Sequence, residues 1–597
     1  MRPGARRDFL AATAALTAAG PVAALSLGPA VSAPKVAIAR GGVPATIAGG
    51  FADRAMARGH RLRDATAATA GAASPPAGSP SAAASPAAAG TAPAVPSTRC
   101  SVLIVGAGIA GLAAARALRA RGVDDYRIVE LDDAIGGNSR ASALDGLPCP
   151  AGAHYLPLPG EAAHEVRDLL TELGVRDAAG RYDERMLCHS PQERLFIHGV
   201  WQDGLLPVVA QSAATFDAYR RFADRVESLR QRHAFALPVA RGAAPRSIGN
   251  LAGVRFGDWL AAEGLQAEAL RWYLDYCCRD DYGAGLDTVS AWAGLHYFAS
   301  RHGFALPEAV IGDRRDAERA GGARSGGGEG LLTWPEGNGW LAERLAAPHR
   351  SRIHTGVTVR RIAHQQAGAA GAGAGHLRID AEVGDGDGAV RAVHWLADWV
   401  VWAAPSFVAA RVIADDGADV TAFRQAAARI RYAAWAVANL AIAPAWQDPS
   451  VERIAWDNVL YGSAALGYVD ARHQRLDRKG GPRLWTWYRA LGPTPAARAA
   501  LAARPWRDWV AEIAADLGRA HPTLAPHLQR VEVHRWGHAM AAPTPELIGS
   551  GALDVLRRPV GRIYPANSDL AGYSVFEEAV YWGSRAGGAV AERLGRG

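Results

Sequence analysis

The sequence predicts an α/β protein built around a parallel sheet with helices packed on its faces. The apolar run Val102–Val105 is typical of a buried parallel strand, and it leads through a glycine-rich turn into an alanine- and leucine-rich helix. A second apolar strand, Tyr126–Val129, ends at the acid Glu130. Near the other end of the chain, Ile563–Ala586 shows the same order of strand, turn and helix.

The glycine-rich turn has the spacing of a dinucleotide-binding fingerprint. Gly106 permits the tight turn, Gly108 lets the backbone approach a pyrophosphate, and Gly111 allows the helix to pack on the strand. Ile109 and Ala110 open the helix, whose free N–H groups and partial positive charge favour phosphate. A glycine turn alone could serve packing, but a strand before it and a helix after it predict a Rossmann-type dinucleotide site.

Glu130 stands nineteen residues after Gly111, where an acid accepts hydrogen bonds from a ribose hydroxyl. An NADP site would instead favour an arginine near the ribose. The sequence therefore predicts a dinucleotide without a phosphate on that ribose.

After Glu130 the chain continues with Gly136, Gly137 and Asn138, and on these residues it resembles the flavin amine oxidase superfamily. That superfamily also contains protoporphyrinogen oxidases and carotenoid desaturases. Its members carry a Gly-Gly-Arg turn beside the pyrophosphate of FAD, so the resemblance implies FAD as cofactor and both glycines as contacts. Asn138 occupies the usual arginine position, and Arg140, two residues on, is the candidate phosphate contact.

The C-terminal segment resembles the second FAD motif of the same superfamily. By that match Asp569 binds the ribityl-phosphate part of FAD, and the backbone N–H groups near Val575 and Phe576 face the flavin ring. A helix N-terminus there would stabilise the negative charge of reduced flavin. An ordinary helix start, with Ser574 as N-cap and Glu577 at the third position, is a compatible alternative.

Two adjacent arginines, Arg6 and Arg7, precede an apolar stretch and predict a twin-arginine signal peptide over residues 1–33. We therefore expect the twin-arginine export machinery as a partner and a periplasmic or otherwise exported location. Gly20–Pro21 interrupts the stretch, which is too weakly apolar for a stable membrane span.

The length of 597 residues predicts more than one domain. The net charge is +7, but the basic residues are scattered rather than gathered in a stripe, which argues against nucleic acid as a partner. Residues 34–98, rich in alanine, proline and serine, are predicted to be a disordered linker. No spacing of Cys and His indicates a metal site, and the adjacent Cys277 and Cys278 are expected to be packing residues.

The remaining chain is predicted to interleave an FAD-binding domain with a mixed α+β substrate domain, as the resemblance implies. The FAD-binding parts are 99–160, 331–408 and 550–597, and the substrate parts are the mainly helical 161–330 and 409–549. Within the middle FAD-binding part, the alternating strand Ile353–Ile362 resembles the superfamily strand whose backbone contacts adenine, which makes Val359 a contact. A loop is expected at Gly312–Gly330.

His154 is the first candidate for catalysis, because a Gly-Ala-His turn matches a flavin-adjacent segment of the superfamily. A neutral imidazole could act as a base or orient the substrate, or it could be a structural histidine. Asp280 and Asp281 could bind a cationic amine, but a helix cap or an ion pair with Arg279 is favoured. His296–Tyr297 is expected in the core. Further candidates for the site lining are Trp334, Asn338, Trp340, Trp536 and His538.

The resemblance implies an exported FAD-dependent oxidoreductase that removes a hydride from a small-molecule donor, an amine or polyamine, with oxygen or another acceptor reoxidising the flavin. Superfamily amine oxidases often place a lysine near the flavin, whereas Lys35 and Lys479 are the only lysines here. Two alternatives therefore stay open: a desaturase or protoporphyrinogen oxidase-like enzyme acting on an apolar substrate, and a weakly catalytic FAD-binding partner protein.

Overall fold

A computed structural model describes residues 46–53, 56–61, 97–311, 330–365, 376–384, 390–475 and 482–595. The predicted signal peptide, both lysines and the predicted loop up to residue 329 lie outside these ranges.

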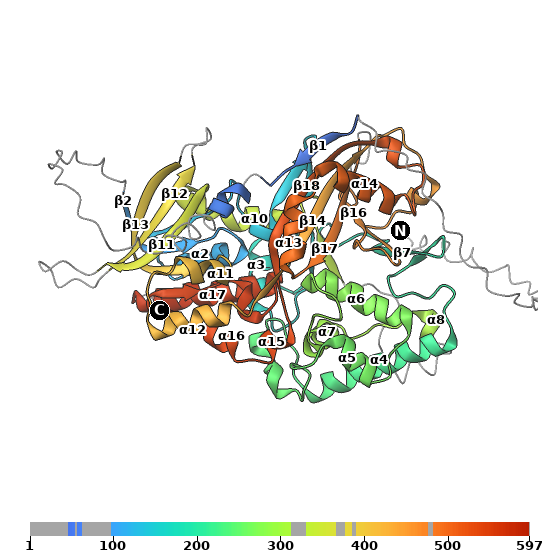
Figure 1. Ribbon diagram of the computed structural model, residues 1–597, viewed down its shortest axis with the longest axis horizontal. Helices are drawn as coiled ribbons and strands as arrows, with labels where there is room; N and C mark the ends of the chain where they lie inside the picture. The colour runs from blue at the N-terminus through green and yellow to red at the C-terminus, as the bar shows by residue number, and fades with distance from the viewer. Residues whose placement is uncertain are drawn as a thin grey trace, which may run out of the picture. The chain divides into compact units, whose positions relative to one another are not determined.

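A seven-stranded sheet contains the predicted fingerprint (Figure 1). Its parallel strands are β10 (Ile353–His354), β3 (Tyr126–Val129), β2 (Ser97–Val105), β13 (Val390–Trp402) and β19 (Ile563–Pro565). β12 (His376–Gly384) and β11 (Val357–Gln365) extend the sheet in antiparallel fashion. The first half of β13 pairs with β12 and its end pairs with β19, so three separated segments of the chain share this sheet.

The second sheet has eight strands, of which all but β1 belong to the predicted substrate region. In spatial order they are β1 (Ala48–Phe51), β18 (Leu528–Ala542), β14 (Arg431–Ile442), β17 (Arg483–Gly492), β16 (Tyr468–Asp470), β15 (Asp457–Leu460), β7 (Glu193–Ile197) and β8 (Val200–Asp203). β14 is buried along almost its whole length. Its alanine-rich sequence has little strand propensity, which is why sequence analysis missed it.

Helices cover both sheets. On the dinucleotide side are α2 (Ile109–Ala120), α3 (His164–Glu172), α10 (Gly339–Ala346), α11 (Ser406–Val412), α12 (Ala418–Ala427), α16 (Ala552–Leu556) and α17 (Phe576–Arg593). The substrate region holds α4 (Ala213–Arg232), α5 (Phe256–Ala262), α6 (Glu268–Tyr282), α7 (Ala291–Ala299), α8 (Glu308–Ile311), α13 (Pro495–Ala503), α14 (Trp506–Leu517) and α15 (Pro545–Ile548). Two small sheets pair β4 (Ala141–Leu144) with β5 (Leu147–Pro150), and β6 (Tyr155–Pro157) with β9 (Leu331–Thr333).

The predicted linker is corrected at its N-terminal part. β1 pairs in parallel with β18 at the edge of the eight-stranded sheet, and residues 56–61 are helical. β2 begins at Ser97, two residues before the expected start of the folded chain. The composition of this segment did not indicate β1, because its sequence Ala-Gly-Gly-Phe has little strand propensity of its own and forms a strand by pairing with β18.

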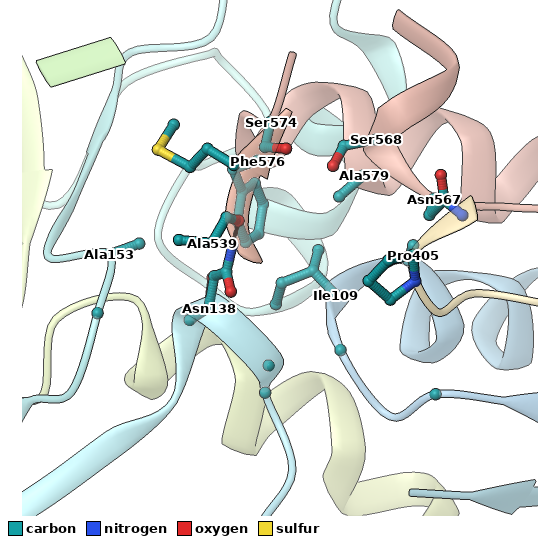
Figure 2. A pocket seen from close by; sticks show the side chains of 18 of the residues that line it. Ile109, Asn138, Ala153, Pro405, Ala539, Asn567, Ser568, Ser574, Phe576 and Ala579 are labelled. Carbon is teal, nitrogen blue, oxygen red and sulfur yellow. Dashed lines mark hydrogen bonds between the residues drawn. The ribbon is translucent and has the colours of Figure 1, made fainter. Parts of the chain in front are cut away.

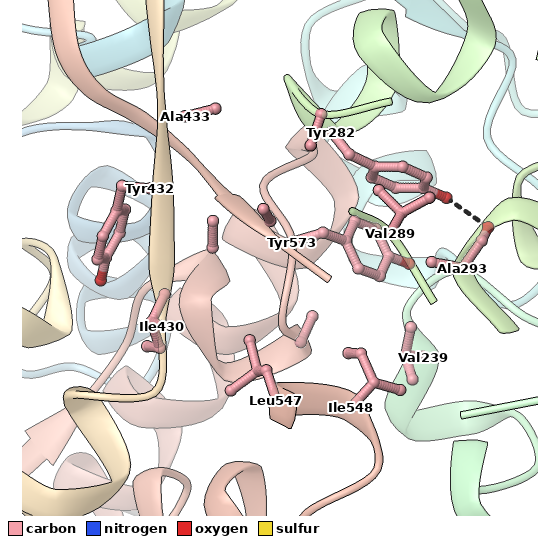
Figure 3. Packing of buried hydrophobic residues seen from close by; sticks show 14 of the residues in the cluster. Val239, Tyr282, Val289, Ala293, Ile430, Tyr432, Ala433, Leu547, Ile548 and Tyr573 are labelled. Atoms are coloured by element: carbon pink, nitrogen blue, oxygen red, sulfur yellow. Dashed lines mark hydrogen bonds between the residues drawn. The ribbon is translucent and has the colours of Figure 1, made fainter. Parts of the chain in front are cut away.

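Aromatic side chains from distant segments pack in the largest core (Figure 3). Tyr573, which directly follows the C-terminal turn, packs edge-on against Tyr282, whose hydroxyl donates to the carbonyl of Ala293 at 2.9 Å. His296 is buried in the same region, as expected. The core thus joins the C-terminal FAD motif to helices α6 and α7.

Helices α2 and α17 lie side by side at unusually short range. A Cβ added at Gly583 would stand 2.1 Å from the carbonyl oxygen of Ala110, and one added at Gly587 would stand 2.4 Å from that of Ala114. Both contacts are with backbone atoms, which cannot move aside cheaply. Glycine is therefore required at these two points of contact between the FAD-binding helices.

All five cysteines are buried and free, including Cys277 and Cys278. Among the described helices, none combines the length and apolarity that a membrane crossing would need.

We predict that Gly583→Ala destabilises the protein by about 1–3 kcal/mol, because the added methyl overpacks a rigid contact. Alanine normally stabilises a helix interior relative to glycine by about 1 kcal/mol. A loss of stability in Gly583→Ala would therefore indicate the close contact between the helices. Gly588→Ala is the matched control, since its Cβ would meet only the exposed guanidinium end of Arg121. Urea unfolding measures both, and equal stability of the two variants would contradict the close-packing argument.

Candidate active site

Most of the residues predicted to bind the cofactor line a cavity of about 460 Å³. Figure 2 shows part of its wall. Residues from β2, the fingerprint turn, β11, the end of β13 and the start of α17 line one part of it. Residues from α6, β14, β17 and β18 line another. The seven-stranded sheet and the substrate region therefore meet around one space.

The fingerprint turn has the predicted geometry. Gly106 has a φ of 106°, and a Cβ at Gly111 would stand only 1.9 Å from the Gly106 carbonyl oxygen. Gly108 lines the cavity, and a Cβ added there would have only the Cα of Gly137 within 4 Å, at 3.9 Å. Gly136 donates its N–H to the carbonyl of Ala107 at 2.9 Å, which fixes the two glycine turns against each other.

The N-terminus of α2 is free to bind an anion. Gly108 is its N-cap and provides no side-chain hydrogen bond, and the first turn contains no acid. Ile109 and Ala110 line the cavity, whereas Gly111 does not and serves packing alone.

Glu130 lies at the cavity wall at the end of β3. One carboxylate oxygen accepts the N–H of Ala107 at 2.6 Å and the other accepts that of Asp132 at 2.9 Å. Burial raises the pKa of this carboxyl, and these two backbone donors partly offset the rise. Each oxygen keeps a lone pair for a ribose hydroxyl, so the assigned role remains compatible with the geometry.

Arg140 is not among the residues that line this cavity. Its guanidinium forms an ion pair with Asp132 and lies over the ring of Trp536, 5.2 Å from the ring centre. It borders a neighbouring space beside β1 and β18 instead. The phosphate contact assigned to Arg140 stays a prediction, while Gly136 and Gly137 do line the main cavity.

Asp569 is buried at the same cavity. Its Oδ2 accepts the N–H of Ser406 at 2.8 Å and a hydrogen bond from the hydroxyl of Tyr432. These donors position the carboxylate, whose pKa burial raises. Tyr432, from the unpredicted strand β14, is a site residue that sequence analysis missed.

The start of α17 also faces the cavity, through Val575 and Phe576, and Figure 2 shows Phe576 there. The expectation that Ser574 caps the helix was wrong, because Val575 is the N-cap and provides no side-chain hydrogen bond. The Ser574 hydroxyl accepts the N–H of Ala541 instead. No side chain at the N-cap position therefore occupies the N–H groups at the start of α17.

Val359 lines the cavity together with Val357 and Thr358 on β11. Ile353–Ile362 is divided between β10 and β11 at Gly356, whose φ is 73°. Val357 donates its N–H to the Glu130 carbonyl at 2.8 Å, which brings the predicted adenine-binding strand beside the predicted ribose-binding acid.

His154 lies at the substrate side, surrounded by aromatic rings. It stacks on Tyr488 with 4.3 Å between ring centres and contacts Tyr155 and Trp456. Within the described residues its ring nitrogens have no hydrogen-bond partner. Burial lowers the pKa of His154 to about 3, so the imidazole is neutral and weakly basic.

Asp280 and Asp281 do not form the ion pair with Arg279 that sequence analysis favoured. Arg279 forms its ion pair with Asp275 rather than with either of them. Asp280 lines the cavity and accepts a hydrogen bond from the Tyr155 hydroxyl at 2.9 Å. Asp281 pairs with Arg301, which sequence analysis did not single out because it follows α7, on another helix than the acids.

Of the other lining candidates, Asn338, Trp536 and His538 border the cavity. Trp334 and Trp340 stack on each other and are not part of its wall. The buried Oδ1 of Asn338 and Oγ1 of Thr358 lack hydrogen-bond partners. Orphaned polar atoms and two uncapped helix starts in one cavity fit a large polar ligand with phosphate groups.

The model of the flavin containing amine oxidoreductase family matches residues 109–591. The chain belongs to this family. Membership confirms FAD as the cofactor and the class of FAD-dependent oxidoreductase. FAD fits the residues present: the starts of α2 and α17 and the glycine turns would hold it, with Glu130 and Asp569 as polar contacts.

Similar proteins are diverse. A putative flavin-containing monoamine oxidase, AofH, of Mycobacterium tuberculosis is 26% identical over 45% of this chain and 52% of its own length. Protoporphyrinogen oxidase 2 of Arabidopsis thaliana is 41% identical over 13% of this chain and 14% of its own length. The chain thus spans about half or less of these relatives.

Among solved structures, putrescine oxidase bound to putrescine is 18% identical, with a TM-score of 0.58 over 84% of this chain and all of that one. Cyclohexylamine oxidase from Brevibacterium oxydans is 19% identical, with a TM-score of 0.57 over 83% and 99%. These likenesses confirm the predicted fold class, an FAD-binding sheet domain with a substrate domain.

We predict that Glu130→Gln weakens FAD binding about tenfold to a hundredfold, because a hydrogen bond to a charged group contributes about 1.5–3 kcal/mol. Quenching of flavin fluorescence on titrating the apo-protein measures the dissociation constant. Glu172→Gln, which alters only a surface ion pair with Arg116, is the control. An unchanged constant for Glu130→Gln would remove the ribose assignment.

Proposed function

We propose that this protein oxidises an amine whose ammonium group is bound at the acidic end of the FAD cavity. The observation that carries this proposal is the position of Asp280, which lines the same cavity as the cofactor-binding residues. Bound FAD would accept a hydride from the neutral form of the amine, which forms when the bound ammonium loses its proton to water. The residues of this chain bind, orient and shield the amine beside it.

The charges at that end favour a cation. Asp281 and Arg301 neutralise each other, with 3.2 Å between their nearest charged atoms. Asp280 and Glu577 remain as further acids in the cavity wall. Burial, followed by the charge of Asp281, raises the pKa of Asp280 to about 6, so Asp280 is ionised at neutral pH. A carboxylate in a poorly hydrated wall attracts an ammonium more strongly than it would in water.

Aromatic rings complete the binding surface. Tyr155 and Tyr488 line the cavity, and His154 contacts both of them and Trp456. Such rings exclude water and contact the alkyl or aryl part of an amine, and their faces attract cations. Because the pKa of His154 is so low, we assign it to this wall rather than to proton abstraction.

The described cavity wall contains no lysine. Oxygen or another acceptor would then reoxidise the flavin without help from a lysine ammonium of this wall. The alternative of an apolar substrate, as in protoporphyrinogen oxidases, is less well supported, because the acids would be desolvated without a counter-charge. A weakly catalytic partner protein would not need a substrate wall at all.

We further propose export by the twin-arginine route, supported by Arg6 and Arg7 at the start of the chain. Cell fractionation with an Arg6→Lys and Arg7→Lys double variant tests this. Retention of the variant in the cytoplasm, with the natural chain in the periplasm, is the expected result. The same location for both chains would contradict it.

We predict that aliphatic amines and diamines bleach the flavin absorbance under anaerobic conditions. For a reactive amine, kcat/KM should fall as the pH is lowered through about 6, because protonated Asp280 no longer attracts the cation. Asp280→Asn should raise KM at least tenfold at neutral pH. In this variant kcat/KM should no longer fall as the pH is lowered through about 6. Asp275→Asn, which changes the acid paired with Arg279 outside the cavity, is the control.

An unaltered KM in Asp280→Asn would refute the assigned amine site. No bleaching by any amine, with FAD tightly bound, would refute the proposed activity itself.

We predict that His154→Phe keeps kcat within about threefold, because phenylalanine preserves the stack on Tyr488. His154→Ala should raise KM by opening the aromatic wall. Steady-state kinetics of both variants separate the roles. A hundredfold loss of kcat in His154→Phe would show that the imidazole itself takes part in proton transfer.

A further inference from the structure

The short N-terminal segment formed by residues 46–53 and 56–61, here called the strap, contacts both the substrate sheet and the cofactor domain. We infer that the strap retains FAD, with Arg58 as a positioning residue for the loop that follows Glu130. This inference rests on FAD as the cofactor and on the cavity-facing position of Glu130, and it does not depend on the substrate.

One end of the strap is fixed to the eight-stranded sheet. β1 pairs with β18 from Ala48 to Phe51, and Ala52 donates its N–H to the Val533 carbonyl at 3.0 Å. Gly49 has a φ of 129°, and a Cβ there would stand 1.9 Å from the Val531 carbonyl oxygen. The pairing of β1 with β18 therefore depends on a glycine at this position.

A buried ion pair secures the same end. The Asp53 carboxylate lies 3.0 Å from the Arg535 guanidinium, and each side chain is at most 10% exposed. Arg535 also lies over the ring of Phe51, 3.6 Å from its centre. Breaking a buried pair leaves an uncompensated charge, so this end of the strap is firmly held.

The other end reaches the cofactor domain through Arg58. Its guanidinium donates to the carbonyl of Leu131 and to Asp133, the latter at 2.8 Å. The Arg58 side chain is only 16% exposed. Leu131 lines the FAD cavity next to Glu130, so Arg58 holds the backbone directly behind the predicted ribose contact.

The loop that Arg58 contacts, Leu131–Asp133, is also hydrogen-bonded to Glu130 and to the residue that precedes β11. Asp132 donates its N–H to the Glu130 carboxylate, and its carbonyl accepts the N–H of Gly356, which precedes β11. Movement of this loop would therefore disturb Glu130 and the predicted adenine-binding strand together. A segment that lies before the fingerprint in the sequence thus contacts the loop beside the predicted ribose-binding acid. Figure 1 shows β1 of this segment beside β18.

Arg58→Ala and Gly49→Ala in the full-length chain test the inference at the two ends of the strap. Each should raise the dissociation constant for FAD at least tenfold, measured by flavin fluorescence on titrating the apo-protein. Arg58→Lys should restore part of the loss, since an ammonium can donate to the Leu131 carbonyl. Gly50→Ala is the matched control, because its Cβ would meet nothing within 4 Å.

Unfolding of the apo- and holo-proteins separates retention of the cofactor from plain structural support. Ligand binding stabilises the folded state in proportion to the logarithm of affinity. In Arg58→Ala the stability difference between holo- and apo-protein should therefore shrink while the apo-protein keeps its stability. Equal losses in both forms, or an FAD dissociation constant within twofold of that of the natural chain, would overturn the inference. Failure of every amine to reduce the flavin would leave these binding measurements unaffected.

Discussion

The backbone contact between α2 and α17 is the constraint on which the rest of the structure depends. Gly583 and Gly587 let α17 approach Ala110 and Ala114 of α2 at a distance that a side chain at either glycine would not permit. The starts of both helices then face one cavity. Two helix dipoles from opposite ends of the chain therefore act on the same ligand, which neither end could position alone.

The cavity separates two electrostatic environments. Around the glycine turns and the helix starts, free N–H groups present partial positive charge to phosphates and to the flavin. On the substrate side, Asp280 and Glu577 make the wall acidic, while Arg301 neutralises Asp281. Burial strengthens both fields, because few water molecules screen them. An amine and a phosphate-bearing cofactor can thus occupy one continuous space at opposite ends.

Strand pairing and hydrogen bonds connect the FAD-binding parts of the chain with the substrate parts. β13 joins the fingerprint strand β2 to both β12 and β19, so the FAD-binding sheet is assembled from three separated segments. β14 contributes Tyr432, which positions Asp569, and so couples the substrate sheet to the C-terminal FAD motif. The strap adds a connection at the edge, from β18 to the loop after Glu130. Cofactor and substrate sites are consequently not independent units.

The sequence by itself determined the dinucleotide fingerprint, the acid at the end of β3 and the C-terminal motif, because these depend on local glycine geometry and on short apolar runs. Tertiary structure decided what distant residues do to one another. It paired Asp281 with Arg301 rather than its neighbour Arg279, left α17 without a side-chain cap, and placed β1 and the alanine-rich β14 in a sheet. These ion pairs, helix starts and strand partners arise from packing between separate elements, which no local pattern records.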